Sequence, residues 1–223
     1  MTIRDLGLRL GVCAVCAGAP FAAAAQDFTG FYIGGSLAAV DAGGDYTAYT
    51  PRNGYAGFDV QDLSVNALGG GLHLGRSWDM GGWILGAEAS LIGFGGSETS
   101  TRSVEEGTVP PFTREVQNQF ALTPRVGLPL GNALVFAKAG LAVSKIGAAH
   151  EMSGSVIEGS DTKTGWIIGL GAEIPMIANI NARIELTHAD YGTDRYDLGT
   201  SGRWVEQDLD TDTVTVGFSV YFD

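Results

Sequence analysis

Six ionisable side chains stand inside otherwise apolar segments, and their types are the ones most suited to chemistry. Three are acids and three are bases: Glu88, Glu173, Glu185, Arg125, Lys138 and Arg183. Paired carboxylates could act as a general acid and a general base. An unpaired buried ion, however, costs several kcal/mol, and here each acid can be matched by one base. The equal numbers favour a structural network of ion pairs over an active site.

The segments that carry these six residues alternate with the period of a β-strand. In the segment around Glu88, Trp83, Leu85 and Ala87 alternate with Ile84 and Gly86. Successive side chains of a strand point to opposite faces, so one face is apolar and the other is small or charged. The same pattern recurs in the segments that hold the other five ionisable residues. The sequence therefore predicts strands with two chemically different faces.

The alternation is strictest at the C-terminus. Over residues 213–222, Val214, Val216, Phe218, Val220 and Phe222 share one face, and the residues between them share the other. About ten residues is the length of a tilted strand that crosses a membrane. A terminal strand of this kind, ending in an aromatic residue, is typical of an outer-membrane β-barrel.

The N-terminus predicts export. Arg4 and Arg9 precede an apolar stretch from Leu10 to Phe21, and Ala23 and Ala25 fit the small-x-small pattern of a signal-peptidase site. We expect residues 1–25 to be a cleaved signal peptide and residues 26–223 to form the barrel domain. Both cysteines of the chain lie in the predicted signal peptide, so we expect neither disulfides nor thiol chemistry in the mature protein. A membrane anchor or a lipoprotein fits this segment less well.

The sequence predicts eight strands joined by alternately long and short connections. The strands are expected near Thr29–Ala39, Leu63–Trp78, Trp83–Phe94, Gln119–Leu128, Leu134–Lys145, Thr164–Ile174, Ala182–Tyr191 and Thr211–Phe222. Three connections are short turns with glycine, asparagine or proline. The long polar connections are expected at Asp41–Asp62, Gly95–Asn118, Ile146–Lys163 and Gly192–Asp210. This asymmetry predicts an all-β, antiparallel, up-and-down transmembrane barrel with periplasmic turns, extracellular loops and a location in the outer membrane.

The six ionisable residues must then face the lumen, because lipid cannot host them. An eight-stranded barrel has an interior only wide enough for side chains to fill it. We therefore expect Glu88, Glu173, Glu185, Arg125, Lys138 and Arg183 to form a plug of salt bridges, with glycine on the same face making room. The inverse arrangement would give a soluble, lipocalin-like binder, but its outer surface would consist mostly of Gly, Ala, Ser and Thr, which is poor for solubility.

Three segments of the chain resemble a known family. Residues 27–35 (DFTGFYIGG), 165–173 (GWIIGLGAE) and 182–192 (ARIELTHADYG) are similar to the first, sixth and seventh strands of the small OmpA-like, porin-like surface-antigen barrels of alphaproteobacteria. The resemblance spans the mature chain, although Asp223 here follows the terminal aromatic residue. It implies an eight-stranded, non-enzymatic outer-membrane barrel, and members of the family are described as porin-like, antigenic or adhesive, some with reported haem binding.

Aromatic residues gather near both predicted ends of the strands. Phe28, Trp78, Trp83, Tyr221 and Phe222 lie near the periplasmic end, and Phe94, Phe120, Trp166 and Tyr191 lie near the outer end. This distribution predicts two aromatic girdles at the membrane interfaces. Arg76 interrupts the apolar face near the periplasmic end, where its charged head can snorkel towards water.

The remaining polar residues give weaker leads. His73 is expected to point inwards, His150 to sit in a loop and His188 to face outwards near the top of its strand. Enzymes that modify outer-membrane lipids place His and Ser there, but Ala189 and Asp190 follow His188 instead of a Ser-Asn pair. The acidic residues of the long loops show no calcium-binding spacing, so divalent ions bridging them to lipopolysaccharide phosphates are the simpler interpretation.

These observations predict a structural and surface-interaction barrel without catalytic residues, cofactors or a dedicated metal site. Its expected partners are outer-membrane lipids and lipopolysaccharide, the barrel assembly machinery, and a host or environmental ligand bound by the loops. A net charge of −12 argues against nucleic acid. The alternatives are a small passive pore and, less well supported, an outer-membrane lipid-modifying enzyme.

Overall fold

The computed structural model describes residues 28–43, 45–49, 58–62, 65–95, 97–100, 103–104, 107–108, 112–152, 155–197 and 204–222. The predicted signal peptide, residues 1–25, and the cleavage site before Gln26 lie outside the described residues. Among the described residues, no helix is long and apolar enough to span a membrane.

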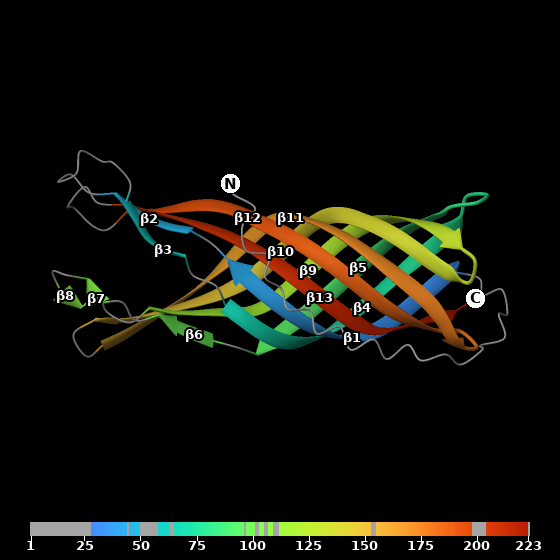
Figure 1. The fold of residues 1–223 in the computed structure, drawn as a ribbon, viewed down its shortest axis with the longest axis horizontal. Coiled ribbons are helices and arrows are strands. Elements are labelled where there is room, and N and C mark those ends of the chain that lie inside the picture. Colours follow the sequence, from blue (N-terminus) through green and yellow to red (C-terminus); the bar gives the residue numbers. More distant parts are fainter. Residues whose placement is uncertain are drawn as a thin grey trace.

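Eight long strands close into an antiparallel barrel, as the sequence predicted (Figure 1). Each strand pairs with the next one along the chain. The last strand pairs with the first over residues 31–43 and 210–222, beginning with Phe31 opposite Phe222, and this closes the ring. The eight strands are β1 (Gly30–Gly43), β4 (Val65–Asp79), β5 (Ile84–Gly95), β9 (Phe112–Leu130), β10 (Ala133–Met152), β11 (Ser155–Ile177), β12 (Ile180–Asp197) and β13 (Trp204–Phe222). Closure leaves no free edge among these strands, which satisfies the backbone hydrogen bonds inside a bilayer.

Three tight turns lie together at the end of the barrel where the chain enters β1 and leaves β13. They join β4 to β5, β9 to β10, and β11 to β12. Gly81, Gly82 and Gly131 adopt positive φ angles of 79°, 113° and 65°, which side chains with a Cβ rarely adopt. This end is called the turn end below. The general rule for bacterial barrels predicts that this end faces the periplasm.

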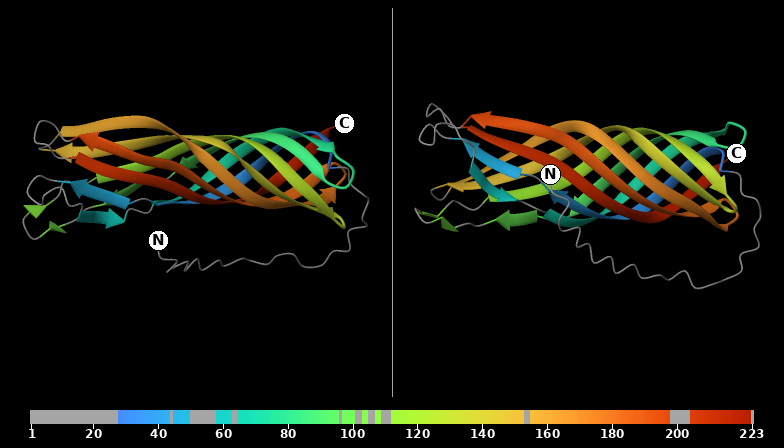
Figure 2. Two further views of the ribbon diagram at one scale, coloured as in Figure 1. Left: turned by 90° about the horizontal axis from the view of Figure 1, so that it is seen from above. Right: turned by 45° about the horizontal axis from the view of Figure 1, so that its top comes forward.

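At the opposite end the strands run further than predicted (Figure 2). Most of the predicted loop Ile146–Lys163 is strand, because β10 and β11 stay paired up to Met152 and Ser155. His150, expected in a loop, is therefore part of β10. Short strands lie in two of the other connections. Between β1 and β4, β2 (Asp45–Tyr49) pairs with β13 and β3 (Phe58–Asp62) pairs with β2. Between β5 and β9, β6 (Ser97–Ser100) pairs with β9, and β7 (Ser103–Val104) pairs with β8 (Gly107–Thr108). Alternation failed to reveal these extensions because backbone pairing needs no apolar face beyond the bilayer.

The apolar face of each strand points outwards. Leu170, Leu122 and Val216 are 63%, 55% and 56% exposed, whereas Glu88 is 1% exposed. The face assignment made from the alternation is therefore confirmed, and the soluble, lipocalin-like alternative is wrong.

The predicted aromatic girdles are only partly present. Trp78, Trp83, Phe222, Phe120 and Trp166 are between 39% and 49% exposed on the outer wall. Four others point into the barrel and are buried: Phe28, Phe94, Tyr191 and Tyr221. The girdle prediction was wrong for these four because it used their height along the barrel and ignored the face on which each lies.

Candidate functional site: an ion network across the lumen

All six ionisable residues singled out from the sequence point into the lumen and meet in one layer. They come from five neighbouring strands of the wall, β5, β9, β10, β11 and β12. None is more than 5% exposed. Three carboxylates face three bases, so the layer carries no net charge when all six are ionised. This neutrality matters because charges removed from water must be compensated within the layer.

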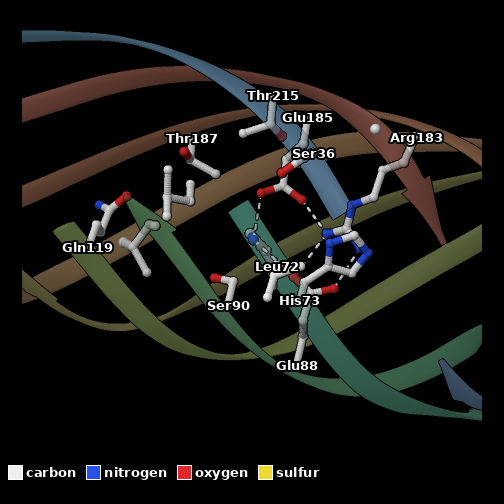
Figure 3. A pocket seen from close by; sticks show the side chains of 14 residues that line it. Ser36, Leu72, His73, Glu88, Ser90, Gln119, Arg183, Glu185, Thr187 and Thr215 are labelled. Carbon is white, nitrogen blue, oxygen red and sulfur yellow. Dashed lines mark hydrogen bonds and ion pairs between the residues drawn. The ribbon is translucent and has the colours of Figure 1, made fainter. Parts of the chain in front are cut away.

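Arg183 is the centre of one half of the layer. Its Nη1 and Nη2 atoms donate to Glu88 Oε2 and Oε1 at 2.7 and 2.9 Å, which makes a bidentate pair. Its Nη2 also donates to Glu185. Lys138 Nζ lies 3.1 Å from Glu88 and 2.5 Å from Glu185, so it bridges the same two carboxylates. Figure 3 shows Arg183 lying between Glu185 and Glu88.

Arg125 is the centre of the other half. Its Nη1 donates to Glu173 Oε1 at 2.7 Å, and its Nη2 donates to Ser77 Oγ at 2.9 Å and to Tyr221 Oη at 2.8 Å. The Tyr221 hydroxyl in turn donates to Glu173 Oε2 at 2.7 Å. The Arg183 Nη1 atom lies 3.5 Å from Glu173, which links the two halves into one network.

Hydroxyl and aromatic side chains complete the network on the remaining strands. Tyr32 on β1 donates to Glu88 at 2.9 Å, Ser77 belongs to β4 and Tyr221 to β13. With these partners the layer has a member on every one of the eight barrel strands. The guanidinium of Arg125 lies 4.4 Å from the centroid of the Tyr32 ring, and both arginines lie about 5 Å from the Phe136 ring.

Glycine provides the space for these long side chains. A Cβ atom added to Gly86 would lie 2.8 Å from Cγ of Arg125, which is closer than real Cβ contacts. A Cβ on Gly171 would meet the ring of Phe136 and, at 2.8 Å, the backbone oxygen of Ile184. The glycines of the lumen face therefore accommodate the arginines and the aromatic ring between them.

Apolar layers cover the network on both sides. Towards the turn end, Phe28, Ile84 and Leu134 form a small buried cluster. Towards the far end, two larger clusters of buried apolar residues lie inside the barrel: Ala38, Val40, Ala42, Ala67, Ile92 and Phe94, and then Ala121, Ala142, Ile167, Ala189, Tyr191 and Leu209. A cavity of about 20 Å³ beside Glu88, Lys138 and Thr215 is large enough for about one water molecule.

The sequence matches an established family over nearly its whole length. The model of the outer membrane protein beta-barrel domain matches residues 10–222. The chain belongs to this family.

The chain is similar to two outer-membrane proteins in sequence and to one solved outer-membrane barrel in fold. The "31 kDa outer-membrane immunogenic protein" of Brucella melitensis is 30% identical, with 92% of this chain and 88% of that protein covered. The "22 kDa outer membrane protein" of Rhizobium leguminosarum bv. viciae is 26% identical, with 89% and 80% covered. The outer membrane protein OprG from Pseudomonas aeruginosa shares the fold with a TM-score of 0.56 and 12% identity, over 87% of this chain and 96% of that one. The chain is therefore an outer-membrane β-barrel, and these two relatives are outer-membrane proteins of alphaproteobacteria.

Sequence reasoning missed several partners in the lumen of this outer-membrane barrel. Tyr32, Ser77, Phe136 and Tyr221 were not assigned to the network, and the apolar clusters were not foreseen. His73 was expected to face inwards, which is confirmed, and its Nε2 lies 3.0 Å from Ser219 Oγ. The parity of each strand was the available signal, since these residues alternate with the apolar outward face. Ser77 shares its face with His73, and Phe136 shares its face with Lys138.

The chemistry available to the network is limited by its pairing. Each carboxylate is held by at least one guanidinium or ammonium group. A general acid or base must reach a proton of the substrate, and apolar side chains separate these carboxylates from both ends of the lumen. The six ions therefore compensate one another's charge within the layer.

His188, the one enzymatic lead, faces outwards as expected. Its Nδ1 lies 2.8 Å from Asp212 Oδ1, and its ring is 5.5 Å from that of Trp166. Its direct partners across the sheet are Ile168 and Asp212. Neither side chain offers a hydroxyl or thiol that the imidazole could activate by taking up its proton.

Proposed function

We propose that the protein is a closed barrel that acts as a scaffold on the bacterial surface. It anchors long strand hairpins in the outer membrane and presents them outside the cell, where they contact the environment or a host. It is neither an enzyme nor an open channel. The observation that carries the proposal is the buried ion layer, which has a member on each of the eight strands.

The ion layer supports closure on energetic grounds. A continuous water path along the axis would require separation of the Arg183–Glu88 and Arg125–Glu173 pairs, both fully buried. Breaking a buried pair costs about 3–5 kcal/mol when one charge is left uncompensated. The apolar clusters on both sides would have to open in the same event. Open states of the barrel should therefore be rare and brief.

The partners follow from the outer surface of the barrel. The exposed apolar wall contacts outer-membrane lipids, and the rim contacts lipopolysaccharide. The barrel assembly machinery inserts the chain, and the extended hairpin of β10 and β11 meets a host or environmental ligand. The name of the Brucella relative, an immunogenic outer-membrane protein, supports exposure of this face at the cell surface.

Planar-bilayer recording tests closure. The refolded barrel should show no persistent conductance, while Lys138→Met should increase brief, small openings because it removes a base that bridges Glu88 and Glu185. Lys145→Met is the matched control, since Lys145 is exposed on the same strand and should leave the recording unchanged. Persistent conductance of the unaltered protein, at the level of sixteen-stranded porins, would contradict the proposal of a closed scaffold and show that the protein is a pore.

Cysteine labelling on intact cells tests the orientation. The two cysteines of the chain lie at positions 13 and 16, within the predicted signal peptide, so single cysteines can be introduced without background. His150→Cys, in the extended part of β10, should react with a membrane-impermeant maleimide. Met80→Cys, in the turn between β4 and β5, should react only after lysis. The reverse result would place the turns outside and remove the basis of the proposal.

A further inference from the structure

Three potential metal ligands lie together on the outer wall, on the face of the strands opposite to the lumen network. They are one nitrogen of His188 on β12 and one carboxylate oxygen each of Asp210 and Asp212 on β13. All three atoms lie within 4.8 Å of one another. The strands are adjacent, and His188 is the direct partner of Asp212 in the sheet. Pairing of the two strands therefore creates a mixed imidazole and carboxylate set.

The cluster stands at the border of the apolar wall. On the same face, the next side chains towards the turn end are Leu186 and Val214, followed by Val216. Leu186 and Val216 are 54% and 56% exposed, as expected for residues that face lipid. Towards the far end the outward residues are Asp190 and Asp208. The three ligands thus lie where the lipid-facing surface gives way to the head-group region.

Carboxylates outnumber basic side chains around the cluster, and this excess of negative charge favours the binding of a cation. Asp190 is directly opposite Asp210, and Asp41 is directly opposite Asp212. Like charges that face each other across a sheet are destabilising. Side chains are described for residues 31–43 of β1, 182–193 of β12 and 208–222 of β13. Among the outward-facing ones in these ranges, His188 is the only side chain that can carry a positive charge. One protonated imidazole would still leave this patch strongly negative.

We propose that His188, Asp210 and Asp212 bind a divalent metal ion of the zinc class. Imidazole suits zinc, copper and nickel, whereas calcium takes six to eight oxygen ligands, more than this set provides. Bound Zn²⁺ needs ligand distances of about 2.0–2.2 Å, and rotation of partly exposed side chains can supply the small adjustment. His188 and Asp212 have that freedom, since their side chains are 38% and 65% exposed. Three protein ligands leave a coordination position open towards the head groups.

Titration calorimetry of the folded barrel with Zn²⁺ in detergent tests the proposal. We expect one saturable site per chain and a much weaker response to Mg²⁺. His188→Gln and Asp212→Asn should each weaken Zn²⁺ binding by more than about tenfold, because each removes a ligand. Asp41→Asn is the matched control: it removes a charge opposite Asp212 but no ligand, and it should leave the affinity within about threefold. Retained heat-dependent gel mobility would show that each variant still folds.

Trp166 gives an independent readout of position. Its ring lies 5.5 Å from that of His188, so Cu²⁺ bound at the cluster should quench its fluorescence. Trp166→Phe should remove the quenched component and leave Zn²⁺ affinity unchanged. If Asp41→Asn weakened Zn²⁺ binding as much as His188→Gln, the metal would be attracted by the acidic surface in general and not by these three ligands, which would overturn the proposal. The absence of saturable Zn²⁺ binding, or quenching that survives Trp166→Phe, would overturn it as well. These results are independent of whether the lumen conducts.

Discussion

Arg183 and Glu88 form a bidentate ion pair across the full width of the barrel. Their strands, β12 and β5, are four strands apart in either direction around the ring of eight, so the pair joins opposite walls. Arg125 on β9 makes the equivalent connection to Tyr221 on β13. Two such crossings in one layer tie the wall together from inside. The stability of the barrel should therefore depend on contacts between side chains that are far apart in the sequence.

The cross-lumen pair should show strong coupling in a double-mutant cycle. Arg183→Met leaves Glu88 buried without its main partner and should destabilise the barrel by about 3–5 kcal/mol. Glu88→Gln should destabilise it for the converse reason, and the double variant should cost clearly less than the two single changes added together. Urea unfolding of the refolded protein measures all three. Arg76→Met is the control, since Arg76 is exposed and contacts Phe31 and Trp78 on the outer wall. Strict additivity would mean that the pair contributes nothing specific.

Charge reversal inside the lumen should be far more damaging than charge reversal at the rim. Glu173→Lys would place a fourth base beside Arg125 and Arg183 with two carboxylates left, at a cost of several kcal/mol. Asp41→Lys, on the exposed outer wall opposite Asp212, should change stability by no more than about 0.5 kcal/mol. The comparison is made by urea unfolding and by the yield of heat-modifiable barrel. Similar effects of the two reversals would contradict a lumen network that needs balanced charge.

An arginine on the lipid-facing wall should be tolerated according to its depth. Leu170 lies on the outward face of β11 and is 63% exposed, so Leu170→Arg should cost roughly 2–4 kcal/mol in a bilayer. Ile177, at the turn end of the same strand, is 68% exposed, and Ile177→Arg should cost only about 0–1 kcal/mol because the charge reaches the interface. Unfolding from lipid vesicles separates the two. Normal stability of Leu170→Arg would show that this part of β11 does not face hydrocarbon.

Two glycines on one strand should respond differently to the same added methyl group. Gly86→Ala would bring a Cβ to 2.8 Å from Cγ of Arg125 and should destabilise the barrel by about 1–3 kcal/mol through overpacking. Gly93→Ala meets nothing within 4 Å and should be nearly neutral. Thermal or urea unfolding of the two variants provides the measurement. A neutral Gly86→Ala would indicate that Arg125 can move without loss of its partners.

Period-two alternation was sufficient to assign the faces of the strands but not to fill the lumen. Glu88 and Leu170 lie on the predicted faces. Lipid excludes the charge of Glu88 from the outer wall, and because side chains alternate along a strand, one assigned residue fixes the face of every other residue in that strand. Tyr221 was misplaced in an aromatic girdle although its neighbour Phe222 already occupied the outer face. The extent of β10 and β11 beyond the membrane was also missed, since solvent on both sides removes the chemical contrast that reveals a strand.

The sequence by itself determined the barrel, the number of its strands and the six ions of its lumen, because each of these follows from local pattern and from the exclusion of charge by lipid. Only the tertiary structure decided which acid meets which base. Closure of the ring sets Arg183 opposite Glu88, although 95 residues separate them along the chain. Strand register likewise joins His188 to Asp212 on the outer wall. Such contacts depend on the stagger and closure of the whole sheet, which no single segment specifies.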